Sequence, residues 1–386
     1  TAAVIAKYTD APLQTFSVRF SDSDFDEGSF QQAMARRLGT DHHEITVGAA
    51  DIGAAFPAVV WHTETPVLRA APAPMHLLSG LVRDHGYKVV VTGEGADEVF
   101  AGYDIFREAR LREFIARDPD SEVRAMALQL LYPWMTRSPG QAPAFAREFF
   151  GRNLEVSDPA FSHRPRWDAT ASLLALTVPH PDWAVDVAGG LVATMPEDAP
   201  GWDPLARSQW LEMTTLLPGY ILSSQGDRML MAGSIEGRFP FLDRTVVDVA
   251  NRLPARHKLH GLDEKHILKR AFGDLVPTEI LTRPKQPYRS PDAASFFAGP
   301  DLDWVDEVTS AEAVAEGGVF APRAVTALVA KCRRAGGVRL SNTDNMRVLA
   351  VLSIQLIVTQ FIQGDGSSSY SHPPTQPVIL DRATRT

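Results

Sequence analysis

The turn after residue 91 carries the side chains best suited to chemistry. It holds two glycines and three carboxylates in the run Thr92-Gly93-Glu94-Gly95-Ala96-Asp97-Glu98. Glycines let the backbone pass close to a ligand. The amides of a helix N-terminus favour an anion, and carboxylates there can hold Mg²⁺. A dinucleotide-binding fingerprint is not formed, because Glu98 stands where its third glycine belongs. Taken alone, the turn fits a phosphate and Mg²⁺ site or an acidic turn that caps a helix.

The elements that must position this turn alternate between strand and helix patterns. Apolar and polar residues alternate over 15–20, as in a strand, and Ile45 and Val47 suggest a short strand. The continuous apolar run at 88–92 predicts a strand of the kind buried on both faces of a parallel sheet. Apolar residues at helical spacing predict helices over 30–38 and 75–84. The alternation predicts an α/β layer with a parallel sheet, in which ligands bind beyond the carboxyl ends of the strands.

The rest of the chain has a helical pattern, starting near Asp104. The last helix is predicted at about 345–363. A Ser-, Pro- and Thr-rich composition then predicts a disordered tail over 366–386. We therefore expect one domain over residues 1–365, with 110–205 as its least recognisable helical section.

Composition argues against some classes of binding partner for this chain. Its 386 residues carry a formal net charge of -9, which argues against a nucleic-acid partner because phosphate-binding surfaces are basic. We see no apolar run that approaches the length of a membrane span. The single cysteine, Cys332, excludes an intrachain disulfide and favours a reducing compartment. We expect a cytoplasmic protein that binds neither nucleic acid nor membrane.

The segment around the acidic turn resembles a motif of the asparagine synthetase family, Ser-Gly-Glu-Gly-x-Asp-Glu-hydrophobic-Phe-Gly-Gly-Tyr. Here it reads Thr92-Gly93-Glu94-Gly95-Ala96-Asp97-Glu98-Val99-Phe100-Ala101-Gly102-Tyr103. Further segments resemble the family's in the family's order, at 38–44, 227–232, 236–243, 264–269 and 283–286. The resemblance covers roughly residues 5–110 and 210–362. It implies an α/β fold with a parallel sheet flanked by helices, of the adenine nucleotide α-hydrolase type, followed by a mostly helical C-terminal half.

The resemblance also implies an activity, that of an ATP-dependent amidoligase. Such an enzyme activates the side-chain carboxylate of aspartate as β-aspartyl-AMP and transfers the acyl group to ammonia, which glutamine supplies in the full-length protein. The products are asparagine, AMP and pyrophosphate. The implied cofactors are ATP and Mg²⁺. The implied partners are aspartate, ammonia or glutamine, and an N-terminal glutaminase domain in cis or in trans, with a homodimer left open.

By resemblance, several residues would hold the nucleotide and its metal. Asp97 would be a Mg²⁺ ligand, a role that is compatible with capping a helix. Lys265, which we expect in a helix, would face the phosphates and stabilise the charge that develops during adenylation. A solvated surface lysine is the alternative. The residues expected to bind ATP are Val18, Thr92, Gly93 and Gly95.

Three more side chains would act on the acyl group and the amine. Glu94 would take a proton from the attacking ammonia, and its alternative is a charge at a helix end. Tyr103 would assist orientation, or it is simply a packed tyrosine. Arg69 would bind the α-carboxylate of the substrate through its two-pronged guanidinium.

Two family features are absent from the printed sequence. These are the pyrophosphate loop, Ser-Gly-Gly-x-Asp-Ser, and the N-terminal glutaminase domain. We therefore expect the chain as given to be an incomplete fragment that does not turn over alone. Two other classes stay open. The first is a related adenylating synthetase that forms another amide or a ring, such as a β-lactam synthetase or a lasso-peptide cyclase. The second is a non-catalytic remnant that acts as a binding module.

Overall fold

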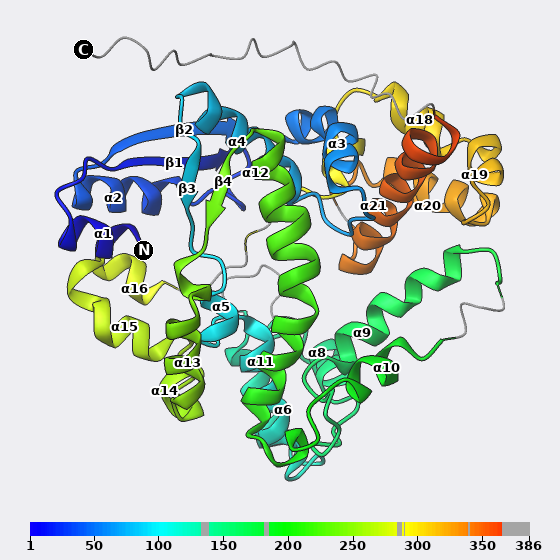
Figure 1. Ribbon diagram of the computed structural model, residues 1–386. Helices are drawn as coiled ribbons and strands as arrows, with labels where there is room; N and C mark the ends of the chain where they lie inside the picture. The colour runs from blue at the N-terminus through cyan, green and yellow to red at the C-terminus, as the bar shows by residue number, and fades with distance from the viewer. Residues whose placement is uncertain (133–138, 181–184, 284–287, 289, 339, 365–386) are drawn as a thin grey trace, which may run out of the picture.

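The computed structural model describes residues 1–132, 139–180, 185–283, 288, 290–338 and 340–364 (Figure 1). The tail predicted over 366–386 lies outside these residues. So does most of the segment 283–286 that contributes to the family resemblance, since only its first residue is described.

The first hundred residues alternate strands and helices, which confirms the predicted pattern. The end of α2 shows how a local residue sets an element boundary, because Gly39 adopts a left-handed conformation (φ 64°) that ends the helix. The elements are α1 (Ala2–Tyr8), β1 (Gln14–Phe20), α2 (Gly28–Leu38), β2 (Asp41–Val47), α3 (Ala49–Thr63), α4 (Pro72–Asp84), β3 (Val89–Val91) and α5 (Ala96–Val99).

The strands pair in parallel, as expected, but they do not form one sheet. β1 pairs with β2 over their full length, from Gln14↔Asp41 to Phe20↔Val47. β3 pairs instead with β4 (Glu236–Arg238), and within the described residues these two-stranded sheets are separate. The mixed α/β class is therefore confirmed, but the expectation of one helix-flanked sheet is wrong. The residue pattern did not predict β4 because its sequence, Glu-Gly-Arg, carries no apolar signal.

The prediction that β3 is buried on both faces is also wrong. Val89 and Val91 are 40% and 45% exposed. Only Val90 packs inward, against a small cluster that includes Phe16 of β1. A run of three valines has high strand propensity whatever covers it, so the run predicted the strand correctly and its burial incorrectly.

Apart from β4, the remaining regular elements of the described chain are helices, joined by turns and loops. The lower part of Figure 1 holds most of those between residues 104 and 282. They are α6 (Asp104–Ala116), α7 (Glu122–Met126), α8 (Pro143–Phe150), α9 (Arg164–Ala171), α10 (Val187–Ala193), α11 (Pro204–Thr214), α12 (Arg228–Ala232), α13 (Arg244–Arg252), α14 (Ala255–Lys258), α15 (His266–Phe272) and α16 (Thr278–Thr282). The C-terminal helices are α17 (Ala294–Phe297), α18 (Asp303–Thr309), α19 (Ala311–Gly317), α20 (Pro322–Arg334) and α21 (Asn342–Ile357).

A long helical column joins the upper and lower parts of the molecule. It consists of α11, a π-helical segment at Leu217–Asp227, and α12 (Figure 1). Its lower end packs against α5 and α6, and its upper end against α4 and α3. The column thus links the region around the acidic turn to the strand-bearing part of the fold.

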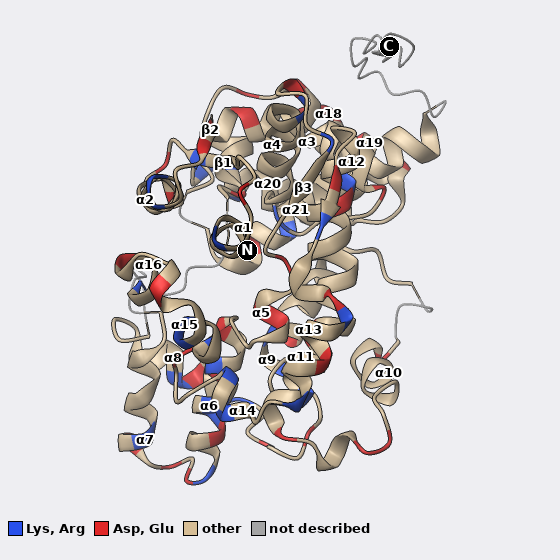
Figure 2. Cartoon of the chain, turned by 60° about the vertical axis from the view of Figure 1, so that its left-hand side comes forward, with Lys and Arg blue, Asp and Glu red and all other residues tan. Residues whose placement is uncertain are grey.

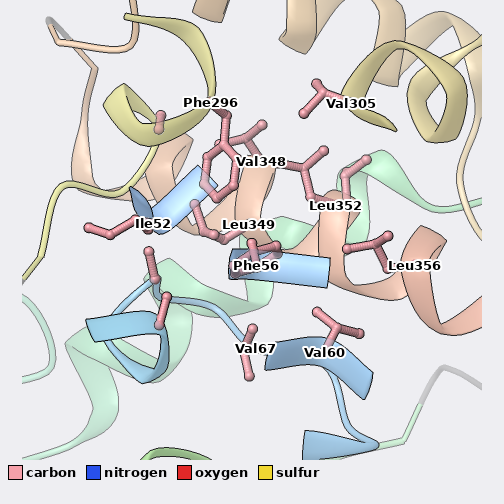
Figure 3. Packing of buried hydrophobic residues seen from close by; sticks show 14 of the residues in the cluster. Ile52, Phe56, Val60, Val67, Phe296, Val305, Val348, Leu349, Leu352 and Leu356 are labelled. Atoms are coloured by element: carbon pink, nitrogen blue, oxygen red, sulfur yellow. The ribbon is translucent and has the colours of Figure 1, made fainter. Parts of the chain in front are cut away.

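The main hydrophobic core lies between α3 and α21 (Figure 3). Ile52 and Phe56 of α3 are fully buried against Leu349 and Leu352 of α21. Apolar side chains from β1, β2, α4, α18 and α20 complete the cluster. The C-terminal helix α21 therefore covers the apolar face of α3 and is part of the main core.

α21 corrects the expectation that no apolar run approaches the length of a membrane span. With its π-helical continuation it forms one helix, Asn342–Gln363, that is long and apolar enough to cross a bilayer. It is the one such candidate in the described part of the chain, and 50% of its apolar window is buried inside the protein. Its apolar residues pack on α3 because it is a core helix, which is why its hydropathy is high.

Candidate functional site

The acidic turn connects β3 to the short helix α5. Gly95 precedes α5 in a left-handed conformation, with φ 88°. A Cβ on Gly95 would lie 2.3 Å from Cδ2 of Leu242, so both its backbone and its surroundings require glycine. At Gly93, by contrast, a Cβ would meet no atom within 4 Å. The turn is therefore fixed against the protein at Gly95 and open at Gly93.

Asp97 meets Lys265 across the turn. The Lys265 amine lies 2.9 Å from Oδ1 of Asp97, and both side chains are mostly buried. The sequence analysis expected Lys265 inside a helix, and that expectation is wrong. It precedes α15 in a left-handed conformation (φ 48°, ψ 31°), and this directs the chain into the helix that follows. Residues far apart in the sequence thus form one charged pair at the N-terminal end of α5.

Gly102 allows that pair to form. Its amide donates to the carbonyl of Asp97 at 2.7 Å, which folds the chain back over α5. A Cβ here would lie 2.1 Å from both Oδ1 of Asp97 and Cε of Lys265. The motif position therefore needs glycine because the two side chains fill the space beside it.

Glu94 lies in the same turn and is half-buried. The Thr92 hydroxyl donates a hydrogen bond to Oε2 of Glu94. Thr92 thereby holds the carboxylate on the face of the turn that follows β3. The family resemblance assigned Thr92 to ATP, and the structure gives its side chain this second role.

Tyr103 contacts Glu98 rather than Glu94. Its hydroxyl donates to Oε1 of Glu98 at 2.8 Å, and its ring stacks on Phe106. Burial raises the pKa of the Tyr103 hydroxyl, so it remains a hydrogen-bond donor. The alternative of a packed tyrosine describes this environment better than a tyrosine directed at the acyl group.

Sequence reasoning gave no role to Glu98. It is 1% exposed, and burial, together with the charges of Asp97 and Glu212, raises its pKa to about 7. In the sequence Glu98 is simply the third carboxylate of an acidic turn. A residue of that kind is normally exposed, so nothing in the sequence indicated that it would be buried. Its side chain is covered by Tyr103 and by the helix α11.

The helix α11 packs against α5 behind the turn. His163, which precedes α9, lies with Nε2 3.1 Å from Oε1 of Glu212 on α11, and both residues are buried. The amide of Gln209, also on α11, donates to the backbone carbonyls of Glu98 and Val99. α11 thus supports α5 directly, and His163, from the least recognisable section 110–205, supports α11 in turn.

We expect Glu98 to make stability fall as pH rises. An unfolded glutamate ionises near its ordinary pKa of 4.5, whereas the folded one ionises near 7. Between these values the folded state keeps a proton that the unfolded state has lost. The free energy of unfolding should therefore decrease through this window, by on the order of 3 kcal/mol, and then level off above pH 7.

Glu98→Gln isolates this contribution. The glutamine amide mimics the protonated acid and still accepts from Tyr103. Denaturant unfolding at pH 5.5 and pH 8 should show that the variant gains stability relative to the parent at the higher pH. Parallel curves for the two proteins would contradict the raised pKa. Other buried acids, such as Asp104, contribute equally to both proteins and cancel in the comparison.

Arg69 and Val18 already have partners within the protein. Nη1 of Arg69 lies 3.0 Å from Oδ2 of Asp292, and Nη2 donates to Oδ1 of Asn342 at 2.7 Å. Val18 is buried in β1, where its carbonyl accepts from Nε2 of Gln31 at 3.1 Å. The structure thus places these residues in the layer formed by β1, α4 and the C-terminal helices.

The turn offers a donor set that fits a magnesium nucleotide. Over the described residues, no group of three or more His, Cys, Asp or Glu could hold a metal by itself. Mg²⁺ in nucleotide sites needs only one or two protein carboxylates beside phosphate and water. Asp97 supplies a carboxylate, Lys265 a cation for phosphate, and Gly93 an open backbone.

Comparisons with known proteins agree with the motif. The family model described as asparagine synthase matches residues 1–359. A putative glutamine-hydrolysing asparagine synthetase of Mycobacterium tuberculosis is 33% identical over 78% of this chain and 45% of its own length. Asparagine synthetase 1 of Bacillus subtilis is 27% identical over 73% and 43%. The amidase chyE of Penicillium rubens is 31% identical over 75% and 45%. The chain spans less than half the length of these relatives.

Proposed function

The chain belongs to the asparagine synthase family, and on that basis we propose that it is the ATP-dependent amidating domain of an asparagine synthetase. The domain would occupy residues 1–365 and have a fold of the adenine nucleotide α-hydrolase type. It would activate the side-chain carboxylate of aspartate and pass the acyl group to ammonia. The observation that supports this proposal most strongly is the Asp97–Lys265 pair beside the glycine-bounded turn.

In the first step, a carboxylate oxygen of aspartate would attack the α-phosphorus of ATP, and pyrophosphate would leave. Lys265 would stabilise the charge on the phosphates. Asp97 would hold Mg²⁺, which neutralises phosphate charge when bound. Val18, Thr92, Gly93 and Gly95 would line the nucleotide, with Gly93 giving it the closest approach to the backbone.

In the second step, ammonia would attack the activated acyl carbon and AMP would leave. The nitrogen must lose a proton as the amide forms, and the Glu94 carboxylate would accept it. Arg69 would bind the α-carboxylate of aspartate, for which it must exchange part of its contact with Asp292 or Asn342. Tyr103 would act indirectly, by fixing Glu98 behind the turn.

The remaining partners follow from the same proposal. Glutamine would supply the ammonia through an N-terminal glutaminase domain, in cis or in trans. A cytoplasmic location would give access to ATP, aspartate and glutamine. A homodimer remains an open arrangement.

The experiment that tests the function uses the longest natural polypeptide containing this sequence. With ATP, Mg²⁺, aspartate and ammonia, we expect AMP, pyrophosphate and asparagine in equal amounts. Glutamate in place of aspartate is the matched control and should give no AMP. ADP in place of AMP, or no dependence on aspartate, would contradict the proposal.

A second candidate is an adenylating synthetase that makes a different amide. Two relatives bear the name amidase, chyE of Penicillium rubens and chry2 of Gibberella zeae, at 31% and 30% identity. Hydroxylamine traps any activated acyl group as a hydroxamate. A panel of carboxylic acids assayed in this way would distinguish the candidates, because only the first requires aspartate.

Gly102→Ala should weaken catalysis without unfolding the protein. The added methyl group would displace the Lys265 amine and the Asp97 carboxylate, which are flexible enough to move away. Misplacement of such groups by about an ångström can cost up to about a hundredfold in rate, so we expect a loss of roughly ten- to a hundredfold. AMP formation measures it.

Gly80→Ala is the matched control for this change. Gly80 lies in α4, and the nearest atom to its added Cβ would be Nη2 of Arg83 at 3.8 Å. An alanine in a helix is about 0.5–1 kcal/mol more favourable than glycine. A normal rate for Gly102→Ala would show that the Asp97–Lys265 geometry is unimportant.

A further inference from the structure

The segment before α15 holds Lys265 in a backbone conformation that a side chain other than glycine rarely adopts. Lys265 is left-handed (φ 48°, ψ 31°), and a strained residue of this kind persists only where its surroundings fix it. Its carbonyl accepts from the amide of Lys269 at 3.1 Å, so α15 fixes it on one side. Figures 1 and 2 both show α5 and α15 below the strands, and the Lys265 amine reaches from α15 to Asp97 of α5. The other side of Lys265 needs a support of its own.

A tight turn lies just before Lys265. The amide of His260 donates to the carbonyl of Asp263 at 3.0 Å, and the amide of Asp263 donates back to the carbonyl of His260 at 2.9 Å. Leu262, inside the turn, packs against an apolar cluster that contains Leu111 and Ile115 of α6. Residues 260–263 therefore form a closed unit that is anchored on the body of the protein and ends at Asp263.

The Asp263 carboxylate fastens this turn to α15 across Lys265. Nζ of Lys269 donates to Oδ1 of Asp263 at 2.7 Å, and Nδ1 of His266 lies 2.7 Å from Oδ2. Burial raises the pKa of Asp263, but the hydrogen bonds from Lys269 and His266 outweigh it and hold that pKa below its ordinary value. The carboxylate is therefore ionised at neutral pH and accepts from both side chains of α15.

Two further contacts span the same residue. Lys269 also donates to Oε1 of Glu264 at 3.0 Å, and Glu264 is buried. The ring of His260 stacks on the ring of His266, with centroids 4.8 Å apart. Both chain neighbours of Lys265, and the turn before them, are thus tied to one another or to α15.

From these contacts we propose that Asp263 is a positioning residue for adenylation, because it fixes the backbone from which Lys265 reaches Asp97. The inference rests on the proposed function, in which Lys265 stabilises charge on the phosphates. Asp263 acts through Lys265, by joining the turn before that residue to the helix after it. When the carboxylate is lost, the Lys265 backbone can leave its left-handed conformation. The amine is then no longer aimed at Asp97 before the nucleotide binds.

A double-mutant cycle on acyl-adenylate formation tests this role in the longest natural polypeptide. Asp263→Asn keeps the shape of a side chain that is 43% exposed, but its amide nitrogen cannot accept a hydrogen bond. Since misplacement by about an ångström can cost up to about a hundredfold, we expect a loss of roughly ten- to a hundredfold. In the Lys265→Ala background the same change should have no further effect, because the group through which Asp263 acts is gone.

The control is Asp248→Asn, at an exposed aspartate of α13 that pairs with Arg244, and it should keep the parent rate. Asp263→Glu retains two acceptor oxygens and should recover part of the loss. A parent-like rate for Asp263→Asn would overturn the proposal. So would an equal loss in the presence and absence of the Lys265 amine, because Asp263 would then support the fold rather than Lys265.

Chemical modification of Lys265 separates this inference from the proposed function. An N-hydroxysuccinimide ester of acetic acid acetylates exposed amines, and mass spectrometry measures the rate at each lysine without ATP. Pairing with Asp97 protects the Lys265 amine, so Asp263→Asn should speed its acetylation by about two- to fivefold, the factor that release of a partly exposed ion pair allows. Lys7, an exposed lysine of α1, should keep its rate. An unchanged rate at Lys265 contradicts the positioning role even in a protein that makes AMP. A faster rate in a protein that makes no AMP supports the role and contradicts the proposed function.

Discussion

Lys265→Ala should reduce formation of the acyl-adenylate by about a hundred- to a thousandfold. Loss of one preorganised group that stabilises developing charge costs about 2.7–4 kcal/mol. Lys265 is held 2.9 Å from Asp97, so its amine is fixed before the nucleotide binds. Quench-flow with radiolabelled ATP and aspartate, without ammonia, measures this step alone.

Arg270→Ala is the control for that measurement. Arg270 is an exposed cation on α15, the helix that Lys265 precedes. It should leave the rate unchanged because its charge lies in solvent. If the two variants have equal rates, the amine of Lys265 does not act on the phosphates.

Glu94→Gln should affect the other half of the reaction. The amide keeps the shape of the carboxylate and can still accept from Thr92, but it cannot take a proton from the attacking ammonia. Loss of a general base costs on the order of a hundred- to ten-thousandfold. We expect the acyl-adenylate to form at a normal rate and to persist after ammonia is added.

Glu236→Gln provides the matched substitution at an exposed glutamate. Glu236 lies on β4 and pairs with Arg238 at the surface, where such pairs contribute little. If Glu94→Gln blocks adenylate formation as strongly as Lys265→Ala, the general-base role fails. Glu94 would then belong with Asp97 around Mg²⁺ and pyrophosphate.

The sequence predicted the local elements of the fold better than their assembly. Strands at β1, β2 and β3 followed from alternation and apolar runs, because these patterns depend on neighbouring residues only. β4 depends on pairing between Val89–Val91 and a segment almost 150 residues later, and Glu236-Gly237-Arg238 has no strand signal of its own. The division into two small sheets could not be predicted for the same reason.

The candidate site shows a similar division. The motif directed attention to Asp97 and Glu94, and the resemblance alone directed it to Lys265. Residue type and the family motif were enough to propose their chemistry. The burial of Glu98 and the contacts of Gln209 could not be predicted in this way, because they arise where α11 packs on α5. Single-sequence patterns do not show which helix lies behind a turn.

The backbone of Lys265 carries a consequence for how this protein tolerates change. A left-handed conformation costs an ordinary side chain roughly 1 kcal/mol or more, and glycine pays none of it. Among uncharged replacements in a saturation library at this position, all of which lose the pair with Asp97, glycine and asparagine should therefore give the most heat-resistant variants, and valine or isoleucine the least. Loss of the pair leaves the mostly buried Asp97 carboxylate uncompensated, so the lysine adds stability through its charge and costs stability through its backbone.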